Sequence, residues 1–305
     1  MTRLPRVGVI GTGAMGLGVV QSLVRGGFDV RARDIRESAQ SGAVRAGALA
    51  AATPATLADE CDIVIVVVVD APQVEVVLFG DQGAAPALAR DSVVMLCSTV
   101  APAFVAGVAR RLRDFGVALL DAPVSGGPQR ALDGTMTMMI SGDAGTICRC
   151  SSVLPAISGR HFVVGAHAGM AATVKVLNNQ LAAANLAAGA EAMALATLAG
   201  IDVSMLLEVM NASSGASWIV DDRMRRRLQG DAEPRAAMTL LAKDSGIAVE
   251  AAAMLGFDAP LARAAHDAFI AAVRAGYAQS DDSALVDYYL RDRTATASRN
   301  DLEHR

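Results

Sequence analysis

Lysine is almost missing from this sequence. Lysine and arginine together number 27 among 305 residues, and only Lys175 and Lys243 are lysines. Arginine stays protonated at any useful pH, whereas a lysine amine can be pushed toward neutrality and can then exchange a proton. Either the two lysines have a chemical role, or they are survivors of an arginine-rich coding bias. Composition alone favours neither explanation.

Aromatic residues are also scarce, at 4% of the chain against 53% for apolar residues as a whole. The core must therefore be built largely from Ala, Val, Leu and Met. At 305 residues the chain is long enough for two domains, because a single core rarely grows beyond ~250–300 residues.

Concentrated positive charge is absent as well. The net charge is −4, and the one basic run, Arg225–Arg227, fits a solvated helix face better than a nucleic-acid stripe. The four cysteines show neither the spacing of zinc ligands nor the pattern of a secreted disulfide framework. We therefore expect no nucleic-acid partner and no metal site.

No basic-then-apolar leader precedes the first apolar run at Val7. The stretch Leu181–Ile201 is long enough to cross a membrane, but it is rich in alanine and carries Asn185 and Glu191. Polar groups of this kind are costly in lipid, which favours a buried helix. We expect a cytoplasmic protein without a membrane partner.

The chain has two halves with different patterns. In the first half, β-branched strand-like runs alternate with helical stretches, as in βαβ units. Strands are predicted at Val7–Ile10, Val30–Arg33, Ile63–Val69, Val93–Cys97, Val117–Leu120 and Met136–Ile140, and helices at Met15–Arg25, Val74–Leu78 and Pro102–Phe115. After about residue 165 only helices are predicted, at 166–198, Val203–Asn211, Met238–Leu255, Pro260–Arg274 and Ser283–Leu290. The sequence thus predicts a doubly wound, mostly parallel α/β domain at 1–165 and an all-α domain at 166–305, joined by the long helix.

The first predicted strand leads into Gly11-Thr12-Gly13-Ala14-Met15-Gly16, which opens a helix. The first glycine permits a tight turn, the second lets the backbone approach a pyrophosphate, and the third allows close helix–sheet packing. The second strand ends at Asp34, whose carboxylate can bind an adenosine ribose and repel a 2′-phosphate. This context predicts dinucleotide binding and favours NAD. Arg33 and Arg36 beside Asp34 keep NADP open.

Hydride transfer to a dinucleotide requires a base for the alcohol proton, and the histidines lie in no recognisable catalytic pattern. Lys175 is the better candidate, because its neighbours in the predicted helix are apolar and amide residues, which argues against a surface lysine. Lowering an amine pKa from ~10.4 to ~7–8 corresponds to roughly 3–5 kcal/mol. Asn179 follows one helical turn later, and its amide can both donate and accept hydrogen bonds.

Two loops after predicted strands offer further ligand contacts. The segment Asp121-Ala122-Pro123-Val124-Ser125-Gly126-Gly127 exposes N–H groups suited to a carboxylate, with an ordinary Pro/Gly turn as the alternative. Ser98 and Thr99 lie at the carboxyl edge of the predicted sheet, where ligands bind. Alternatively, their hydroxyls cap the helix that follows.

Together these motifs resemble those of the β-hydroxyacid dehydrogenase family, which includes 3-hydroxyisobutyrate and tartronate semialdehyde enzymes. The resemblance covers nearly the whole chain and rests on the glycine loop, Asp121–Gly127, Gly169–Asn179 and Lys243-Asp244. One departure is Ala171, where the family often has a glycine. The resemblance implies a Rossmann domain, a connecting helix and a helical domain, assembled as homodimers or homotetramers.

The resemblance also implies roles for individual residues. Lys175 matches the catalytic lysine, and Thr99 and Lys243 match cofactor contacts. The residues that match substrate contacts are Ser125, Gly126, Gly127 and Asn179.

Several short strings are most similar to the L-threonate dehydrogenase branch of the family. They are Val77-Leu78-Phe79-Gly80, Ser217-Trp218 and Asp281-Asp282-Ser283-Ala284. The implied function is NAD-dependent oxidation of a small hydroxy carboxylate, such as a four-carbon sugar acid at carbon 2, with Lys175 as general base. The enzymatic alternatives are an NADP-linked reductase of tartronate or succinic semialdehyde and a 3-hydroxyisobutyrate dehydrogenase. A non-catalytic dinucleotide sensor is the alternative from another class.

Overall fold

The computed structural model describes residues 3–231 and 233–291. The chain divides into two compact units, Met1–Val176 and Leu177–Arg305. The division falls inside a single long helix, α9 (Met170–Leu198). The domain boundary expected at residues 165–166 lies before this helix and stays a prediction. Residues 292–305 of the predicted second domain lie outside the described residues.

The first unit is built on a nine-stranded sheet of order β3-β2-β1-β4-β5-β6-β8-β7, with β9 paired to β8. The strands are β1 (Val7–Ile10), β2 (Val30–Arg33), β3 (Leu49–Ala50), β4 (Ile63–Val66), β5 (Val93–Leu96), β6 (Ala118–Asp121), β7 (Val124–Ser125), β8 (Met136–Ser141) and β9 (Ser158–Gly165). Strands β1 to β6 pair in parallel, and β8 is antiparallel to β6. The doubly wound, mostly parallel sheet is confirmed.

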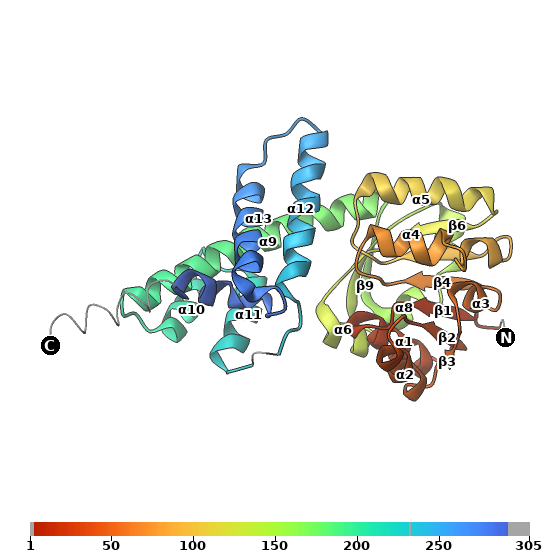
Figure 1. Cartoon of the computed structure of the whole chain (residues 1–305), viewed down its shortest axis with the longest axis horizontal. Coiled ribbons are helices and arrows are strands. Elements are labelled where there is room, and N and C mark those ends of the chain that lie inside the picture. The colour runs from red at the N-terminus through yellow and green to blue at the C-terminus, as the bar shows by residue number, and fades with distance from the viewer. Residues whose placement is uncertain (1–2, 232, 292–305) are drawn as a thin grey trace. The chain divides into compact units, whose positions relative to one another are not determined.

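Helices cover both faces of this sheet. They are α1 (Ala14–Arg25), α2 (Glu37–Arg45), α3 (Pro54–Ala58), α4 (Ala71–Phe79), α5 (Pro102–Asp114), α6 (Gly127–Asp133), α7 (Ala144–Arg149) and α8 (Leu154–Ile157). Figure 1 shows α4 and α5 on one face and α1 and α2 on the other. Because side chains alternate along a strand, Val7 and Val9 pack into one core, whereas Ile10 packs into the other.

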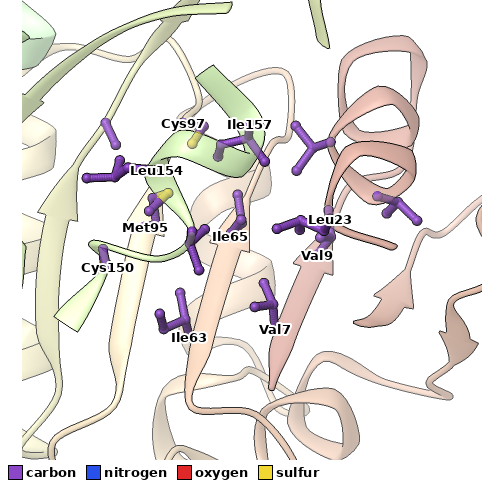
Figure 2. Packing of buried hydrophobic residues seen from close by; sticks show 14 of the residues in the cluster. Val7, Val9, Leu23, Ile63, Ile65, Met95, Cys97, Cys150, Leu154 and Ile157 are labelled. Atoms are coloured by element: carbon purple, nitrogen blue, oxygen red, sulfur yellow. The ribbon is translucent and has the colours of Figure 1, made fainter. Parts of the chain in front are cut away.

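The first of these cores, drawn in Figure 2, joins β1, β4 and β5 to α1 and α8. Strand β4 is buried along its whole length, as expected for a strand covered on both faces. The predicted strand was too long, because Val67–Val69 lie beyond β4 and Val69 is 49% exposed. The sequence also missed β9, whose middle residues are exposed and polar enough to hide a strand pattern.

The described part of the second unit is helical apart from an isolated bridge between Ala237 and Asp281. Its helices after α9 are α10 (Val203–Asn211), α11 (Trp218–Leu228), α12 (Met238–Met254), α13 (Pro260–Ala272), a π-helical turn η2 (Val273–Tyr277) and a 3-10 turn η3 (Asp282–Ala284), followed by helical residues 285–291. They enclose a core that includes Leu186, Met224 and Phe269. The predicted all-α architecture is confirmed, and α11 is an addition to it.

Helix α9 is apolar along much of its length. Within residues 3–231 and 233–291 it is the one helix with the length and hydropathy of a membrane span, and 39% of that window is buried. Core helices of globular proteins meet the same criteria, so this is a weak indication of a membrane. The expected buried helix is buried only on part of its surface, because Leu177, Leu181 and Leu195 are 57%, 63% and 59% exposed.

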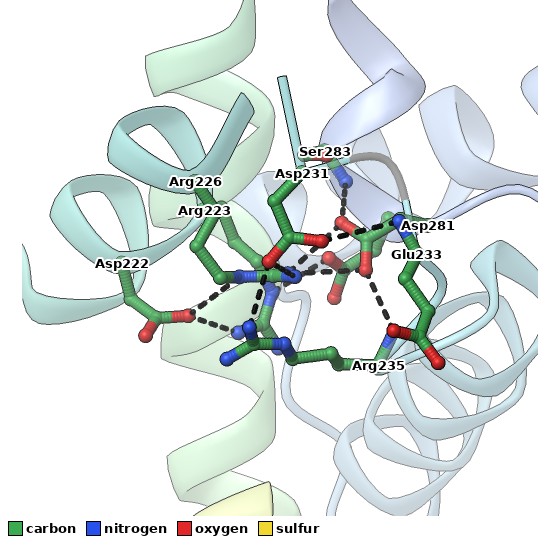
Figure 3. A network of polar contacts seen from close by, with 9 residues as sticks. Asp222, Arg223, Arg226, Asp231, Glu233, Arg235, Asp281 and Ser283 are labelled. Atoms are coloured by element: carbon green, nitrogen blue, oxygen red, sulfur yellow. Dashed lines mark hydrogen bonds and ion pairs between the residues drawn. The ribbon is translucent and has the colours of Figure 1, made fainter. Parts of the chain in front are cut away.

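The basic run on α11 differs from its expected solvated face. Arg225 is exposed, but Arg226 is only 7% exposed, and its Nη2 donates to both carboxylate oxygens of Asp281 at 3.1 and 3.2 Å. Arg223 donates to the buried Asp282 at 2.7 Å. Figure 3 shows this ion cluster, which joins α11 to the turn that contains Asp281. Within this basic run, Arg225 is therefore exposed to solvent as expected, whereas Arg226 forms a buried ion pair.

Candidate active site

Most candidate residues of the first unit lie in loops that begin where neighbouring parallel strands end. The last residues of these strands are paired with one another across the sheet. Arg33 pairs with Ile10, Ile10 with Val66, Val66 with Leu96, and Leu96 with Asp121. Parallel strands thus end together, and the loops that follow them meet at one edge of the sheet. This edge is where ligands bind in open α/β sheets.

The glycine loop occupies the turn from β1 to α1, and its first and last glycines leave no room for a side chain. Gly11 has a φ of +89°, and a Cβ on it would lie 2.4 Å from the Val67 carbonyl oxygen. A Cβ on Gly16 would lie 1.8 Å from the Gly11 carbonyl oxygen. The backbone is therefore packed against itself and its N–H groups open α1, the arrangement that receives a dinucleotide phosphate.

Asp34, one residue beyond β2, is tied to this loop. Its Oδ2 accepts the Thr12 N–H at 2.7 Å, and its Oδ1 accepts the Arg36 N–H at 2.9 Å and Arg36 Nε at 3.4 Å. Burial acts to raise the pKa of the Asp34 carboxyl, but these donors outweigh it, and the pKa lies below its ordinary value. An ionised carboxylate therefore stands at the predicted ribose position. This ionised carboxylate beside the glycine loop favours NAD over NADP.

The two arginines beside Asp34 differ in their contacts. Arg33 Nη1 donates to Gln40 Oε1 at 3.0 Å. The Arg36 side chain is 64% exposed and forms an ion pair with Asp34. It also reaches back over the glycine loop, because a Cβ on Gly13 would lie 3.1 Å from Arg36 Nη2.

Ser98 and Thr99 follow β5 at the same edge. The Ser98 hydroxyl accepts the Val68 N–H at 3.0 Å and so ties the loops after β4 and β5 together. The N-cap residue of α5 is Ala101, whose side chain forms no capping hydrogen bond, so neither Ser98 nor Thr99 occupies the N-cap position. Thr99 is half-buried.

The loop from Asp121 to Gly127 passes from β6 through β7 into α6. Gly126 and Gly127 have φ values of +132° and +76°, a region that strongly favours glycine. Ser125 and both glycines are half-buried, so that their polar groups remain accessible. Two consecutive glycines with positive φ shape this turn, and its role as a carboxylate site stays a prediction.

Lys175 lies on α9 and is 7% exposed. The surface-lysine alternative is therefore wrong. Its helix starts at the same sheet edge: the Gly169 N–H donates to Asp121 Oδ2 at 2.8 Å, and the Ala172 N–H donates to the same oxygen at 3.1 Å. Ala171 is a buried helical residue that donates its N–H to Ser141 Oγ, so the missing family glycine leaves the helix intact.

In the second unit, one carboxylate joins two of the predicted residues. Asn179 Nδ2 donates to Asp244 Oδ2 at 2.7 Å, and Lys243 Nζ donates to Asp244 Oδ1 at 2.6 Å. Asn179 is 9% exposed. Asp244, named in the sequence only as the neighbour of Lys243, is the residue that connects α9 with α12.

The structure thus places eleven of the thirteen predicted site residues in the first unit, and Asn179 and Lys243 in the second. Sequence reasoning missed the contacts of Asp121 and Ser141 with α9, although Asp121 opens a recognised motif. In the described ranges, no group of three or more His, Cys, Asp or Glu residues could hold a metal ion.

A parallel doubly wound sheet, a glycine-lined β1–α1 turn and an ionised carboxylate after β2 define a dinucleotide-binding protein. Family models bear this out over most of the chain. Residues 6–165 match the NAD-binding domain of 6-phosphogluconate dehydrogenase, and residues 169–289 match the NAD-binding domain of NADP-dependent 3-hydroxyisobutyrate dehydrogenase. The chain belongs to the 3-hydroxyisobutyrate dehydrogenase family of β-hydroxyacid dehydrogenases, which confirms the predicted resemblance and the NAD(P)-dependent dehydrogenase class.

The proteins that this chain is similar to are named for different substrates. The chain is 43% identical to the L-threonate dehydrogenase of Cupriavidus necator, over 93% of this chain and 95% of that protein. It is 32% identical to the NAD-dependent L-serine dehydrogenase of Pseudomonas aeruginosa, over 92% and 97%. A crystal structure of 3-hydroxyisobutyrate dehydrogenase from Salmonella typhimurium is 37% identical and superposes with a TM-score of 0.87, covering 93% of this chain and 99% of that one.

Proposed function

We propose that this enzyme oxidises a four-carbon sugar acid, such as L-threonate, to its 2-oxo acid with NAD. The observation that carries the reaction type is the buried Lys175 on α9, the helix that starts at the ligand edge of the sheet. The similarity to L-threonate dehydrogenase, at 43% identity, supports the substrate. The three substrate names above share a small carboxylate that carries a hydroxyl group.

Lys175 acts as the general base in this proposal. In its neutral form this amine accepts the hydroxyl proton while bound NAD accepts the hydride. In the reverse direction the same amine returns the proton. Arginine cannot replace this group, because a guanidinium stays protonated.

The substrate is held by two polar segments. The Ser125 hydroxyl and the N–H groups of Gly126 and Gly127 bind its carboxylate. Asn179 donates to the substrate with the amide hydrogen that its bond to Asp244 leaves over, since an amide nitrogen has two. Asp244 thereby fixes the direction in which that amide points.

The cofactor contacts follow from the loop and the carboxylate. Gly11, Gly13, Ala14, Met15 and Gly16 receive the phosphates, and Asp34 accepts the ribose hydroxyls. Thr99 and Lys243 are the remaining proposed cofactor contacts. The lowered pKa of Asp34 supports NAD over NADP, because an ionised carboxylate repels a 2′-phosphate.

We also infer that the enzyme is a cytoplasmic homodimer or homotetramer. The exposed leucines of α9, Leu177, Leu181 and Leu195, support an assembly in which a second copy covers them. Sedimentation of the purified chain tests the assembly. A monomer at micromolar concentration would contradict it.

A cofactor-reduction screen tests the proposed reaction. It compares both threonates, both erythronates, L-serine and 3-hydroxyisobutyrate with NAD and NADP. We expect the highest kcat/KM for L-threonate with NAD. Faster reduction of tartronate or succinic semialdehyde by NADPH would favour the reductase alternative, and NAD binding without turnover across the whole panel would favour a sensor.

A further inference from the structure

The start of α9 is held by a buried carboxylate that the proposed chemistry does not use. Three donors converge on one oxygen, Asp121 Oδ2: the N–H groups of Gly169 and Ala172, at 2.8 and 3.1 Å, and the Ser141 hydroxyl, at 3.0 Å. The Ser141 oxygen in turn accepts the Ala171 N–H at 3.0 Å. Two side chains thus satisfy three N–H groups at the beginning of the helix.

The place of this pair in the sheet makes its position rigid. Asp121 ends β6 and Ser141 ends β8, and the two residues are paired across these strands. Both are buried, at 1% and 0% exposure. Burial raises the pKa of the Asp121 carboxyl, so that the charge is carried at a cost that the surrounding donors offset only in part.

The backbone before α9 is also restricted. Gly169 has a φ of +99°, and a Cβ on it would lie 2.8 Å from the Pro102 carbonyl oxygen, at the start of α5. The first turn of α9 is therefore bounded on two sides, by the Asp121–Ser141 pair and by the backbone at the start of α5.

Asp121 connects the two parts of the proposed chemistry. It is the first residue of the segment that carries Ser125–Gly127, and it holds the turn from which α9 leads to Lys175. Lys175 lies three residues beyond Ala172, about 4.5 Å along the helix axis. A displacement of ~1 Å at a reacting group can cost ~10²-fold in rate.

We infer that Asp121, together with Ser141, is a positioning residue that sets the Lys175 amine against the Ser125–Gly127 loop. This role rests on the proposed function of Lys175. It differs from a purely structural role in one respect: the carboxylate acts on turnover through the lysine, and has no effect on turnover once the lysine is gone.

A double-mutant cycle on the full-length enzyme tests this difference. Asp121→Asn keeps the shape and an acceptor oxygen but removes the charge. We expect it to lower kcat ~10–100-fold when Lys175 is present, and less than about threefold in the Lys175→Ala background, because effects transmitted through one group are not additive. The KM for NAD should stay within about twofold in both backgrounds.

Ser141→Ala repeats the cycle with a milder change if Asp121→Asn folds poorly. It removes the hydroxyl between Asp121 and Ala171 and keeps the carboxylate. Asp143→Asn is the matched control, since Asp143 caps α7 by accepting the Thr146 N–H at 2.9 Å and is exposed. We expect wild-type kcat for this control.

Equal fold-losses with and without Lys175 would overturn the positioning role and leave Asp121 as a structural cap. That result, obtained with an inactive Lys175→Ala, leaves the proposed base untouched. Wild-type turnover of Lys175→Ala would instead remove the base, and the positioning role with it.

Discussion

The two units bury carboxylates in different surroundings. In the first unit, Asp121 is held by backbone N–H groups and a hydroxyl, and Asp34 by two backbone N–H groups with one exposed arginine. In the second unit, Asp281 and Asp282 face the arginine side chains of α11, and Asp281 accepts the N–H groups of Arg235 and Ser283 in addition. Both arrangements satisfy the acceptor oxygens, but they join different parts of the chain.

This difference indicates what each carboxylate does. A carboxylate that binds N–H groups fixes the path of a loop or the start of a helix, which suits a ligand edge. A carboxylate paired with a buried arginine joins whole elements, here α11 and the Asp281 turn, and removal of one partner leaves a buried charge. We therefore expect changes at Asp121 and Asp34 to act on turnover and cofactor preference, and changes in the ion cluster of Asp281 and Asp282 to act on stability.

The largest effect on turnover is expected for Lys175→Ala. Loss of the base should lower kcat by ~10²–10⁴-fold with little change in NAD affinity, measured by steady-state kinetics and cofactor titration. Lys175→Arg should fail as well, because it keeps the charge and loses the base. Val174→Ala, at an exposed neighbouring position on α9, is the control and should retain wild-type kcat. Near-normal turnover of Lys175→Ala would remove the lysine from the mechanism.

The largest effect on stability is expected for Arg226→Ala. It leaves Asp281 buried without its arginine, which costs ~3–5 kcal/mol and lowers Tm by on the order of 10 °C. The kcat of the folded fraction should not change. Arg225→Ala is the neighbouring control, because Arg225 is exposed and pairs with Asp221 and Glu208 at the surface. Equal Tm losses for both variants would contradict the buried cluster.

Cofactor preference provides a pair of changes with opposite signs. Asp34→Ala removes the carboxylate that repels a 2′-phosphate, so the ratio of kcat/KM for NAD over NADP should fall ~10–100-fold. Arg36→Gln removes the guanidinium that partly neutralises Asp34, and should raise the same ratio ~3–10-fold. Arg33→Gln is the comparison variant and should change the ratio less, since Arg33 donates to Gln40 Oε1 and is linked to Asp34 only through the backbone N–H that the same oxygen accepts. If the NAD/NADP ratio of kcat/KM fell in Arg36→Gln, this arginine would favour NAD binding, and the prediction would be contradicted.

The smallest effect is a pH dependence that comes from Asp282. Burial raises the pKa of this carboxyl to about 6, and the charge of Arg223 opposes the shift without cancelling it. Between the unfolded pKa of ~3.9 and about 6, the folded state binds more protons than the unfolded state. The Asp282 contribution to stability therefore falls as pH rises through this window.

Comparison of wild type with Asp282→Asn isolates this contribution. The Tm difference, wild type minus variant, should decrease from pH 4 to pH 7 in calorimetric scans. The difference is the useful quantity, because Asp34 and Asp281 have lowered pKa values and act in the opposite direction. A pH-independent difference would show that Asp282 does not titrate in this window.

Local patterns account for most of the fold. The α10 helix begins and ends where its apolar periodicity predicted, at Val203–Asn211. The unbroken apolar run of β4 and the glycine loop after β1 were equally readable, because each signal lies within a few neighbouring residues. Strand β9 was missed because its exposed residues follow no apolar alternation. The basic run was expected on a helix face, but the burial of Arg226 on α11 was missed because it depends on what packs against that helix.

The candidate site was readable in part for the same reason. The glycine loop, Asp34, the 121–127 segment and Lys175 could be named from order and spacing along the chain. The partners of these groups could not. Asp121 meets Ser141 across 20 positions and Asn179 meets Asp244 across 65, so these bonds exist only once the sheet and the helices have assembled.

The chain's residue order was sufficient for the dinucleotide-binding half, the helical half and a lysine suited to proton transfer, since glycine geometry and apolar periodicity operate over short stretches. Only the tertiary structure decided that Arg226 is buried in an ion pair with Asp281 and that Asp121 accepts the N–H groups at the start of α9. It confirmed the burial of Lys175 that the neighbouring residues had indicated. Burial and charge pairing depend on which distant residues come together, and a linear pattern of residue types does not carry that information.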